Sequence, residues 1–467
     1  MRIKTRVGGF FCTLFLLTVI TVQTVRADQS ISPQPEGTQQ EAFHDPADDI
    51  SLYATAAVLL DADSGRVLYG KNPDTPMAMA STTKIMTCIQ VLEQASLDET
   101  LTVSAYAAGM PQVKLYIKKG EEYTVRDLLY SLMLESHNDS AVALAEHVGR
   151  KLLSKELQDK PVSEYTAEES RQAVAAFAGL MNAKAAELGC ENTWFITPNG
   201  LDATEETVLP DGTVVQREHC TTAAELARIM AYCIGESDRS EEFLTITRTS
   251  SYSFYANGRS YSCANHNAFL NMMDGALSGK TGFTNKAGYC YVGALESEGR
   301  TFVVALLACG WPNNKTYKWS DTRELMKYGI ENYYYKSFME KGVAFEEDKL
   351  KPIPVLEGCT EILGETAYTP VEIVGREEST VQDSGALKSG GMLNRTQLLM
   401  RADEKIQVTY TVEEQLAAPV ESGTKVGAIE YSVNGTVYRK EDIVITDTVK
   451  RIDLRWCVQQ VFERFLI

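Results

Sequence analysis

The sequence has little that would support a metal site or nucleic-acid binding. It contains five histidines and neither a His-Glu-x-x-His nor a Cys-x-x-Cys string, which are common spacings of zinc ligands. Its 45 basic and 63 acidic residues give a net charge of -18, so the electrostatic attraction to a phosphate backbone is missing. We therefore expect chemistry that needs neither a metal nor a cofactor, and no nucleic-acid partner.

Long apolar runs are also scarce, which excludes a polytopic membrane protein. The strongly apolar stretch 10–22 follows three basic residues and precedes the small residue Ala27, a pattern typical of a secretory signal. A short membrane helix is the alternative, but the stretch falls below the roughly 20 residues that a span needs. The pattern predicts a signal peptide over residues 1–27 and export of the remaining chain.

Cysteine is present but gives no disulfide framework. One of the ten cysteines lies in the predicted signal, and the remaining odd number is widely scattered. Cys88, Cys290 and Cys309 sit inside apolar runs, where we expect them to act as small buried hydrophobic residues.

The length of 467 residues and a hydrophobic content of 44% predict two or three folded units. Residues 28–49 carry almost no large apolar side chains and are typical of a flexible linker. We expect a first domain over 50–340, a β-rich domain over 345–447 and a terminal helix over 448–467.

The first of these domains is predicted to combine strands with helices. Residues 56–61 and 66–71 form a β-prone hairpin, and a second pair of strands is expected over 289–295 and 302–309. Residues 81–94 are apolar on nearly all sides, which is typical of a core helix. Further helices are expected over 322–338 and after three threonines with capping-box spacing, Thr124, Thr166 and Thr222. Strands at both ends with helices between them predict an α+β fold, an antiparallel sheet flanked by helices.

The C-terminal region changes in character. Alternating apolar residues over 406–412 and the pair Asn434-Gly435 indicate strands and a tight hairpin. In the last twenty residues Leu454, Val458, Val461 and Phe465 make one apolar stripe, within a segment of local charge +2. Such a basic amphipathic helix can lie in a membrane interface, while packing on the β-rich domain is the alternative.

Ser81-Thr82-Thr83-Lys84 places a hydroxyl nucleophile at the start of the predicted core helix and an amine three residues on, on the same face. Burial should lower the pKa of the lysine, so that its neutral form can accept the serine proton. The spacing alone is weakly specific, because Ser422-Gly423-Thr424-Lys425 also matches it. We interpret that second copy, which sits in a turn, as coincidence.

Two other short strings could complete a catalytic site. Ser136-His137-Asn138 falls between two predicted helices, where a loop can present side chains to a cleft, although helix capping would explain the same residues. Lys280-Thr281-Gly282 occurs once, just before the second pair of strands, and taken alone it is typical of a turn. His137 and His219 are interpreted as structural residues.

In the order 81, 136 and 280, the three strings resemble the motifs of the penicilloyl serine transferases, Ser-x-x-Lys, Ser-x-Asn and Lys-Thr-Gly. Within that group the chain is similar to the serine D-Ala-D-Ala carboxypeptidases, the low-molecular-mass penicillin-binding proteins. The closer resemblance rests on Ala80-Ser81-Thr82-Thr83-Lys84-Ile85-Met86-Thr87, Ser136-His137-Asn138-Asp139, Thr197-Pro198-Asn199-Gly200-Leu201-Asp202, Asn265-His266-Asn267 and Gly279-Lys280-Thr281-Gly282-Phe283-Thr284. Relative to the compact family pattern, Lys151 to Glu164 and Glu205 to Gln216 look like insertions that could affect access to the cleft.

The resemblance implies an acyl-enzyme mechanism. Ser81 would attack the carbonyl between two terminal D-alanines of a peptidoglycan stem peptide, with Lys84 as proton acceptor and Ser136 as proton relay. Asn138 would hold Lys84 and the substrate amide. Substrate binding would involve Lys280, Thr281, Gly282 and Phe283, with Lys280 and Thr281 on the free carboxylate and the N–H groups of Ser81 and Phe283 as the oxyanion hole.

The resemblance also implies partners and a location. β-Lactam antibiotics would be covalent inhibitors, and the terminal helix would hold the protein on the extracytoplasmic face of the cytoplasmic membrane. Three alternatives differ in activity: a class A β-lactamase, which would need a Glu-x-x-Leu-Asn string that is absent between Asn138 and Lys280; a D,D-endopeptidase or transpeptidase; and a non-catalytic cell-wall scaffold.

Overall fold

The computed structural model describes residues 46–208, 212–362, 364–375 and 395–465. The predicted signal peptide and the linker up to residue 45 lie outside this part of the chain. The last four residues of the predicted linker form a 3-10 turn, Pro46–Asp49 (η1), so the described structure begins before the predicted start at residue 50. Ile50 donates its N–H to the carbonyl of Ala47, and both residues pack against the core.

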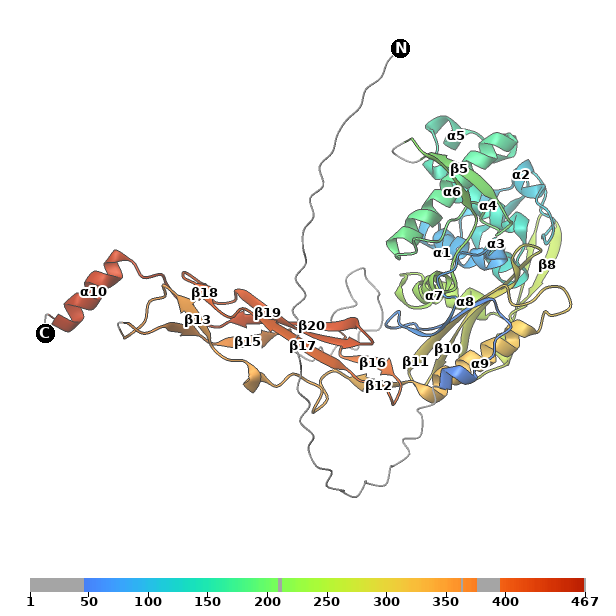
Figure 1. The fold of residues 1–467 in the computed structure, drawn as a ribbon. Coiled ribbons are helices and arrows are strands. Elements are labelled where there is room, and N and C mark those ends of the chain that lie inside the picture. Colours follow the sequence, from blue (N-terminus) through green and yellow to red (C-terminus); the bar gives the residue numbers. More distant parts are fainter. Residues whose placement is uncertain (1–45, 209–211, 363, 376–394, 466–467) are drawn as a thin grey trace, which may run out of the picture. The chain divides into compact units, whose positions relative to one another are not determined.

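A five-stranded antiparallel sheet forms the centre of the first region, in the order β2-β1-β11-β10-β9 (Figure 1). Its strands are β1 (Ala56–Asp61), β2 (Val67–Lys71), β9 (Ala276–Thr284), β10 (Gly288–Ser297) and β11 (Arg300–Leu307). The two predicted hairpins are therefore confirmed. Because β9 pairs with β10 alone in this sheet, its other edge is left open toward the helices.

Helices cover both faces of this sheet, because its strands are apolar on both sides. Side chains of β1 alternate between two buried clusters: Val58 and Leu60 enter one, Ala57 and Leu59 the other. On the first face pack α1 (Lys84–Gln94), which is the predicted core helix, and α7 (Ala223–Ala231). The helix α9 (Tyr317–Asn332) covers the second face.

The remaining helices and three small hairpins lie between the two halves of the sheet in sequence. The helices are α2 (Ala105–Ala108), α3 (Val125–Tyr130), α4 (Asn138–Gly149), α5 (Lys155–Asp159), α6 (Ala167–Glu187) and α8 (Ser240–Arg248). The hairpins are β3 (Thr100–Thr102) with β4 (Glu122–Thr124), β5 (Thr204–Val208) with β6 (Val214–Glu218), and β7 (Ser251–Ala256) with β8 (Arg259–Ala264). Thr124, Thr166 and Thr222 each cap a helix, as predicted. The α+β class is thus confirmed.

One predicted helix has the wrong bounds. Residues 322–338 were expected to be helical, but α9 begins five residues earlier and ends at Asn332. The strand β12 (Tyr334–Ser337) follows and pairs with β16 (Gln397–Met400). This pairing partner is about sixty residues away in the sequence, which is why local helical spacing misassigned the segment. Cys88, Cys290 and Cys309 are buried as predicted.

The C-terminal region is built from short strands, as expected. They are β13 (Ile353–Leu356), β14 (Ala367–Thr369), β15 (Val371–Val374), β17 (Gln407–Val412), β18 (Leu416–Ala417), β19 (Lys425–Val433) and β20 (Thr436–Ile445). Asn434 and Gly435, both with positive φ, turn β19 into β20, which confirms the predicted hairpin. The coincidental Ser422 string lies in the turn before β19, where Gly423 has a φ of 83°.

The terminal helix α10 spans Leu454–Phe465 and is shorter than the predicted 448–467. The preceding residues are extended, because Val449 pairs with Val420 and Arg451 with Gly358. Within the described residues, the search for a helix long and apolar enough to cross a membrane finds no candidate.

Candidate active site

Ser81 stands at the entry to the core helix. Residues Ala80–Thr83 form a 3-10 turn (η2) that continues into α1, whose first residue is Lys84. The turn brings the two side chains of the Ser-x-x-Lys string together, with Lys84 Nζ 2.8 Å from Ser81 Oγ. The nucleophile and the candidate base are therefore in direct contact, as the spacing predicted.

Lys84 is completely buried and has no charged group among its hydrogen-bonding partners in the described structure. Besides Ser81 it contacts Asn138 Oδ1 at 2.9 Å and the main-chain oxygen of Asn199 at 2.6 Å. Burial, with a smaller contribution from the nearby Lys280, holds the pKa of Lys84 well below its usual value.

Ser136 is presented by a break between two helices. A π-helical turn, Ser131–Glu135, follows α3, and Ser136 then adopts a left-handed conformation with a φ of 64° before α4 begins at Asn138. This places Ser136 and Asn138 on a short corner, as expected for a loop held between helices. Ser136 Oγ accepts a hydrogen bond from Lys280 Nζ at 3.0 Å.

Lys280, Thr281 and Gly282 lie on the edge strand β9, so the interpretation of this tripeptide as a turn is wrong and the strand context implied by the family resemblance is right. Lys280 Nζ also donates to the carbonyl of Thr281 at 2.9 Å. The side chain is buried, and burial lowers the pKa of Lys280 to about 7.

Two glycines allow the nucleophile and its neighbours to approach closely. A Cβ atom on Gly282 would lie 2.8 Å from the backbone nitrogen of Ser81, and one on Gly200 would lie 2.0 Å from the carbonyl oxygen of Ala80. Both distances are too short for any side chain. Gly282 therefore sets β9 against the first turn of the catalytic helix, next to the predicted oxyanion hole.

A cavity of about 560 Å³ opens over these residues. Ser81, Ser136, Lys280 and Thr281 line it together with Gly282 and Phe283. One end adds Glu135 and His266, which pair at 2.7 Å, and the other end adds three residues at the start of α9, Lys315, Thr316 and Lys318. The two predicted insertions contribute no described residue to this lining.

The sequence motifs missed two contributors. Asn199 acts through its main-chain oxygen, which accepts from Lys84 and also from Ser81 Oγ at 3.3 Å. Its signal was the Pro-Asn-Gly turn, but a carbonyl cannot be identified from a side-chain motif. Asp139 was quoted within a motif without a role, and its contacts are taken up below.

The two histidines beside the site have structural partners. His219 contacts Thr83 Oγ1 at 2.8 Å and accepts the N–H of Ile196 at 3.0 Å. Burial lowers its pKa to about 3, so the ring is neutral. His137 contacts Ser131 Oγ at 2.8 Å and also has a pKa lowered by burial.

The fold and the geometry define a class of enzyme, in which a serine is activated by a buried lysine and an oxyanion is bound beside an edge strand. A family model described as D-alanyl-D-alanine carboxypeptidase matches residues 40–151 and 166–308, more than half of the chain. The chain belongs to this family. The unmatched gap coincides with the predicted insertion 151–164. A second model, the C-terminal domain of penicillin-binding protein 5, matches residues 400–451.

Individual relatives agree with this assignment. The chain is 23% identical to the D-alanyl-D-alanine carboxypeptidase DacF of Bacillus subtilis, over 85% of this chain and 86% of that protein. It is 30% identical to DacB2 of Mycobacterium tuberculosis, over 54% and 73%. The crystal structure of DacD from Francisella tularensis has the same fold, with a TM-score of 0.58, 20% identity, and coverage of 89% and 99%.

The two depressed lysines predict a bell-shaped pH dependence of acylation. Neutral Lys84 is required to accept a proton, which gives the acid limb. Protonated Lys280 is required to hold a substrate carboxylate, so the second-order rate constant for penicillin acylation should fall as pH rises through about 7. A guanidinium stays charged at this pH, so Lys280→Arg should acylate more slowly overall but lose the alkaline limb. An alkaline limb that persists unchanged in this variant would assign it to another group.

Proposed function

We propose that the protein is a serine D,D-carboxypeptidase that removes the terminal D-alanine from peptidoglycan stem pentapeptides through an acyl-enzyme on Ser81. The observation that carries this proposal is the contact between Ser81 Oγ and the buried amine of Lys84. A neutral amine has two N–H groups and one lone pair. The carbonyls of Asn138 and Asn199 take the two N–H groups, which leaves the lone pair for the serine proton.

Acylation then proceeds with every proton assigned. Ser81 Oγ attacks the carbonyl carbon between the two D-alanines while its proton moves to Lys84 Nζ. The oxyanion forms beside the backbone N–H groups of Ser81 and Phe283. The C–N bond breaks as the leaving amine receives a proton through Ser136, which Lys280 contacts, and an ester on Ser81 remains. Water hydrolyses this ester with Lys84 as the base, which releases the shortened peptide.

Recognition of a chain end follows from the cations in the cavity. Lys280 and Thr281 on β9 would bind the free carboxylate of the last D-alanine, and Asn138 would contact the peptide amide. β-Lactams present a carboxylate and a reactive carbonyl in a similar arrangement, so they would acylate Ser81. A D,D-endopeptidase would use the same residues on a cross-linked peptide, and an assay on both substrates separates the two activities.

We infer that residues 50–340 form the catalytic domain, 345–447 a β-rich domain, and the remaining residues an amphipathic anchor. The match of residues 400–451 to the C-terminal domain of penicillin-binding protein 5 supports the second of these. With a signal peptide over residues 1–27, this organisation places the enzyme on the extracytoplasmic face of the cytoplasmic membrane.

The exposure of α10 supports peripheral membrane attachment. Leu454 is 81% exposed, and Val458, Val461 and Phe462 are 46%, 54% and 58% exposed. A helix that packed this stripe on the β-rich domain would bury these side chains. Instead the stripe is available to a lipid interface, with Arg455 and Arg464 on the same helix to attract anionic headgroups.

Release of D-alanine tests the activity. Purified protein that begins at residue 28 should release D-alanine from a peptide ending in Lys-D-Ala-D-Ala, and Ser81→Ala should abolish the release because the nucleophile is lost. Ser422→Ala, in the coincidental copy of the motif, is the matched control and should retain full activity. Release by the Ser81 variant at the parental rate would show that Ser81 is not the nucleophile.

Co-sedimentation with vesicles containing phosphatidylglycerol tests the anchor. Val458→Glu introduces a charge into the exposed stripe and should greatly reduce binding, because a carboxylate resists transfer into the interface. Gln459→Glu adds the same charge beside the stripe and should reduce binding much less. Equal binding by both variants would mean that the stripe does not enter the membrane.

A further inference from the structure

The segment 111–117 controls which end of the Asn138 amide faces Lys84. Asn138 Nδ2 donates to the carbonyls of Pro111 at 3.2 Å and Gln112 at 3.1 Å, and the backbone N–H of Asn138 donates to Val113 at 2.7 Å. Two carbonyls can only accept hydrogen bonds, so Nδ2 must point toward them. Oδ1 is thereby directed at Lys84 Nζ. If the segment moved, the amide could rotate and present N–H groups to the base.

Asp139 fixes this segment from beneath. Its carboxylate is fully buried and accepts three consecutive backbone N–H groups of the segment: Leu115 at 2.9 Å, Tyr116 at 2.8 Å and Ile117 at 3.3 Å. A fourth N–H, from Ser140, also binds Oδ1 at 3.0 Å. An ionised carboxylate is the side chain that can accept four such bonds, and hydrogen bonds to a charged acceptor are about twice as strong as neutral ones.

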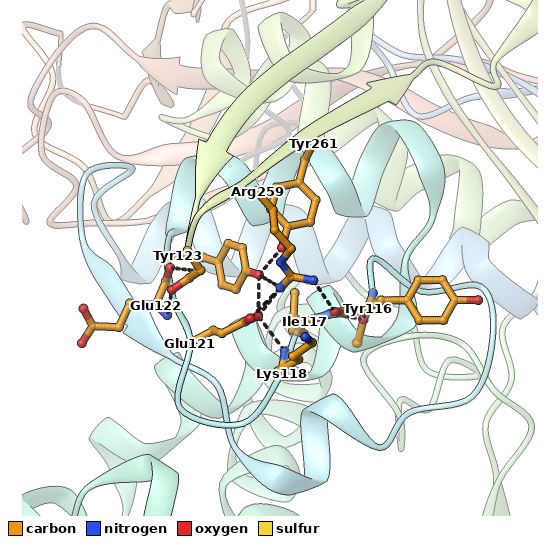
Figure 2. A network of polar contacts seen from close by, with 10 residues as sticks. Tyr116, Ile117, Lys118, Glu121, Glu122, Tyr123, Arg259 and Tyr261 are labelled. Carbon is orange, nitrogen blue, oxygen red and sulfur yellow. Dashed lines mark hydrogen bonds and ion pairs between the residues drawn. The ribbon is translucent and has the colours of Figure 1, made fainter.

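A second carboxylate holds the far end of the same segment (Figure 2). Glu121 accepts the backbone N–H of Lys118 and the hydroxyl of Tyr123, each at 2.8 Å, and forms an ion pair with Arg259 at 2.5 Å. Arg259 also donates to the carbonyl of Tyr116 at 3.4 Å. We call this group, Glu121, Tyr123 and Arg259, the outer clamp. It lies at the side of the segment away from Lys84 and adds no contact to Asn138.

We propose that Asp139 is a positioning residue for the reaction: by holding segment 111–117 it orients the Asn138 amide, and through it the Lys84 amine that activates Ser81. This inference rests on the proposed function of Ser81 and Lys84. It assigns the fourth residue of the Ser136-His137-Asn138-Asp139 string a role that acts through the backbone of a separate segment.

The charge of Asp139 gives this role a recognisable signature. Four titratable groups influence or face Lys84: Lys280 from β9, Asp139 and His137 near the start of α4, and His219 before α7. Of these, Asp139 raises the pKa of Lys84, against the lowering by burial and by Lys280. Replacing Asp139 by a neutral residue should therefore lower the pKa of Lys84 further. The acid limb of acylation should then move to lower pH, whereas a purely structural defect would lower the rate without moving the limb.

The experiment measures the second-order rate constant for acylation by a fluorescent penicillin from pH 4 to 9, with a melting temperature for each variant. Asp139→Asn is expected to reduce the maximal constant by on the order of tenfold to a hundredfold, because misplacement of a base by less than 1 Å has effects of this size. Its acid limb is expected at lower pH than in the parent. Asp127→Asn, which alters another buried carboxylate on α3, is the matched control and should acylate at the parental rate.

Two outcomes would overturn the inference: parental rates with an unmoved limb in Asp139→Asn, or a lowered rate with an unmoved limb. If Asp139→Asn does not fold, Arg259→Gln decides, because it loosens the outer clamp and leaves Asp139 in place. This variant is expected to slow acylation without moving the limb, and unchanged acylation would contradict the positioning role. Failure of the parent itself to be acylated would instead reject the proposed function.

Discussion

The site depends on one constraint, the burial of the Lys84 amine without a compensating negative charge. Its neighbours within hydrogen-bonding distance in the described structure are one hydroxyl and two carbonyl oxygens. Burying an ammonium in such surroundings is costly, whereas a neutral amine satisfies both carbonyls and keeps a lone pair for Ser81. The energy spent on burial thus appears as basicity matched to a serine nucleophile. Lys280, close by and also buried, reinforces the same effect.

The fold supplies this environment from three separate parts of the chain. The catalytic helix brings the nucleophile and the base, the corner before α4 brings Ser136 and Asn138, and the turn at Asn199 brings a carbonyl. The edge strand β9 closes the site, and it can do so only because Gly282 has no side chain to collide with the backbone of Ser81. Carboxylates that contact no substrate atom, such as Asp139, keep these parts in register through backbone N–H groups.

The sequence predicts the side chains of this site better than its backbone. The spacing of Ser81 and Lys84 fixes their contact, because three residues along a helix return to the same face. The main-chain oxygen of Asn199 and the segment held by Asp139 carry no side-chain motif and depend on contacts between distant parts of the chain. Likewise, capping residues located three helix starts, whereas Tyr334–Ser337 followed a strand partner at residues 397–400 that local periodicity does not reveal.

The central claim is that Lys84 is a neutral amine at the pH at which the enzyme works. It is tested most directly by NMR titration of the protein with ¹³Cε-labelled lysine, with the Lys84 signal assigned through Lys84→Gln and that of Lys280 through Lys280→Arg. The account predicts that the Lys84 signal titrates well below the range of the surface lysines. A Lys84 signal that titrates with the surface lysines, near pH 10.4, would contradict it.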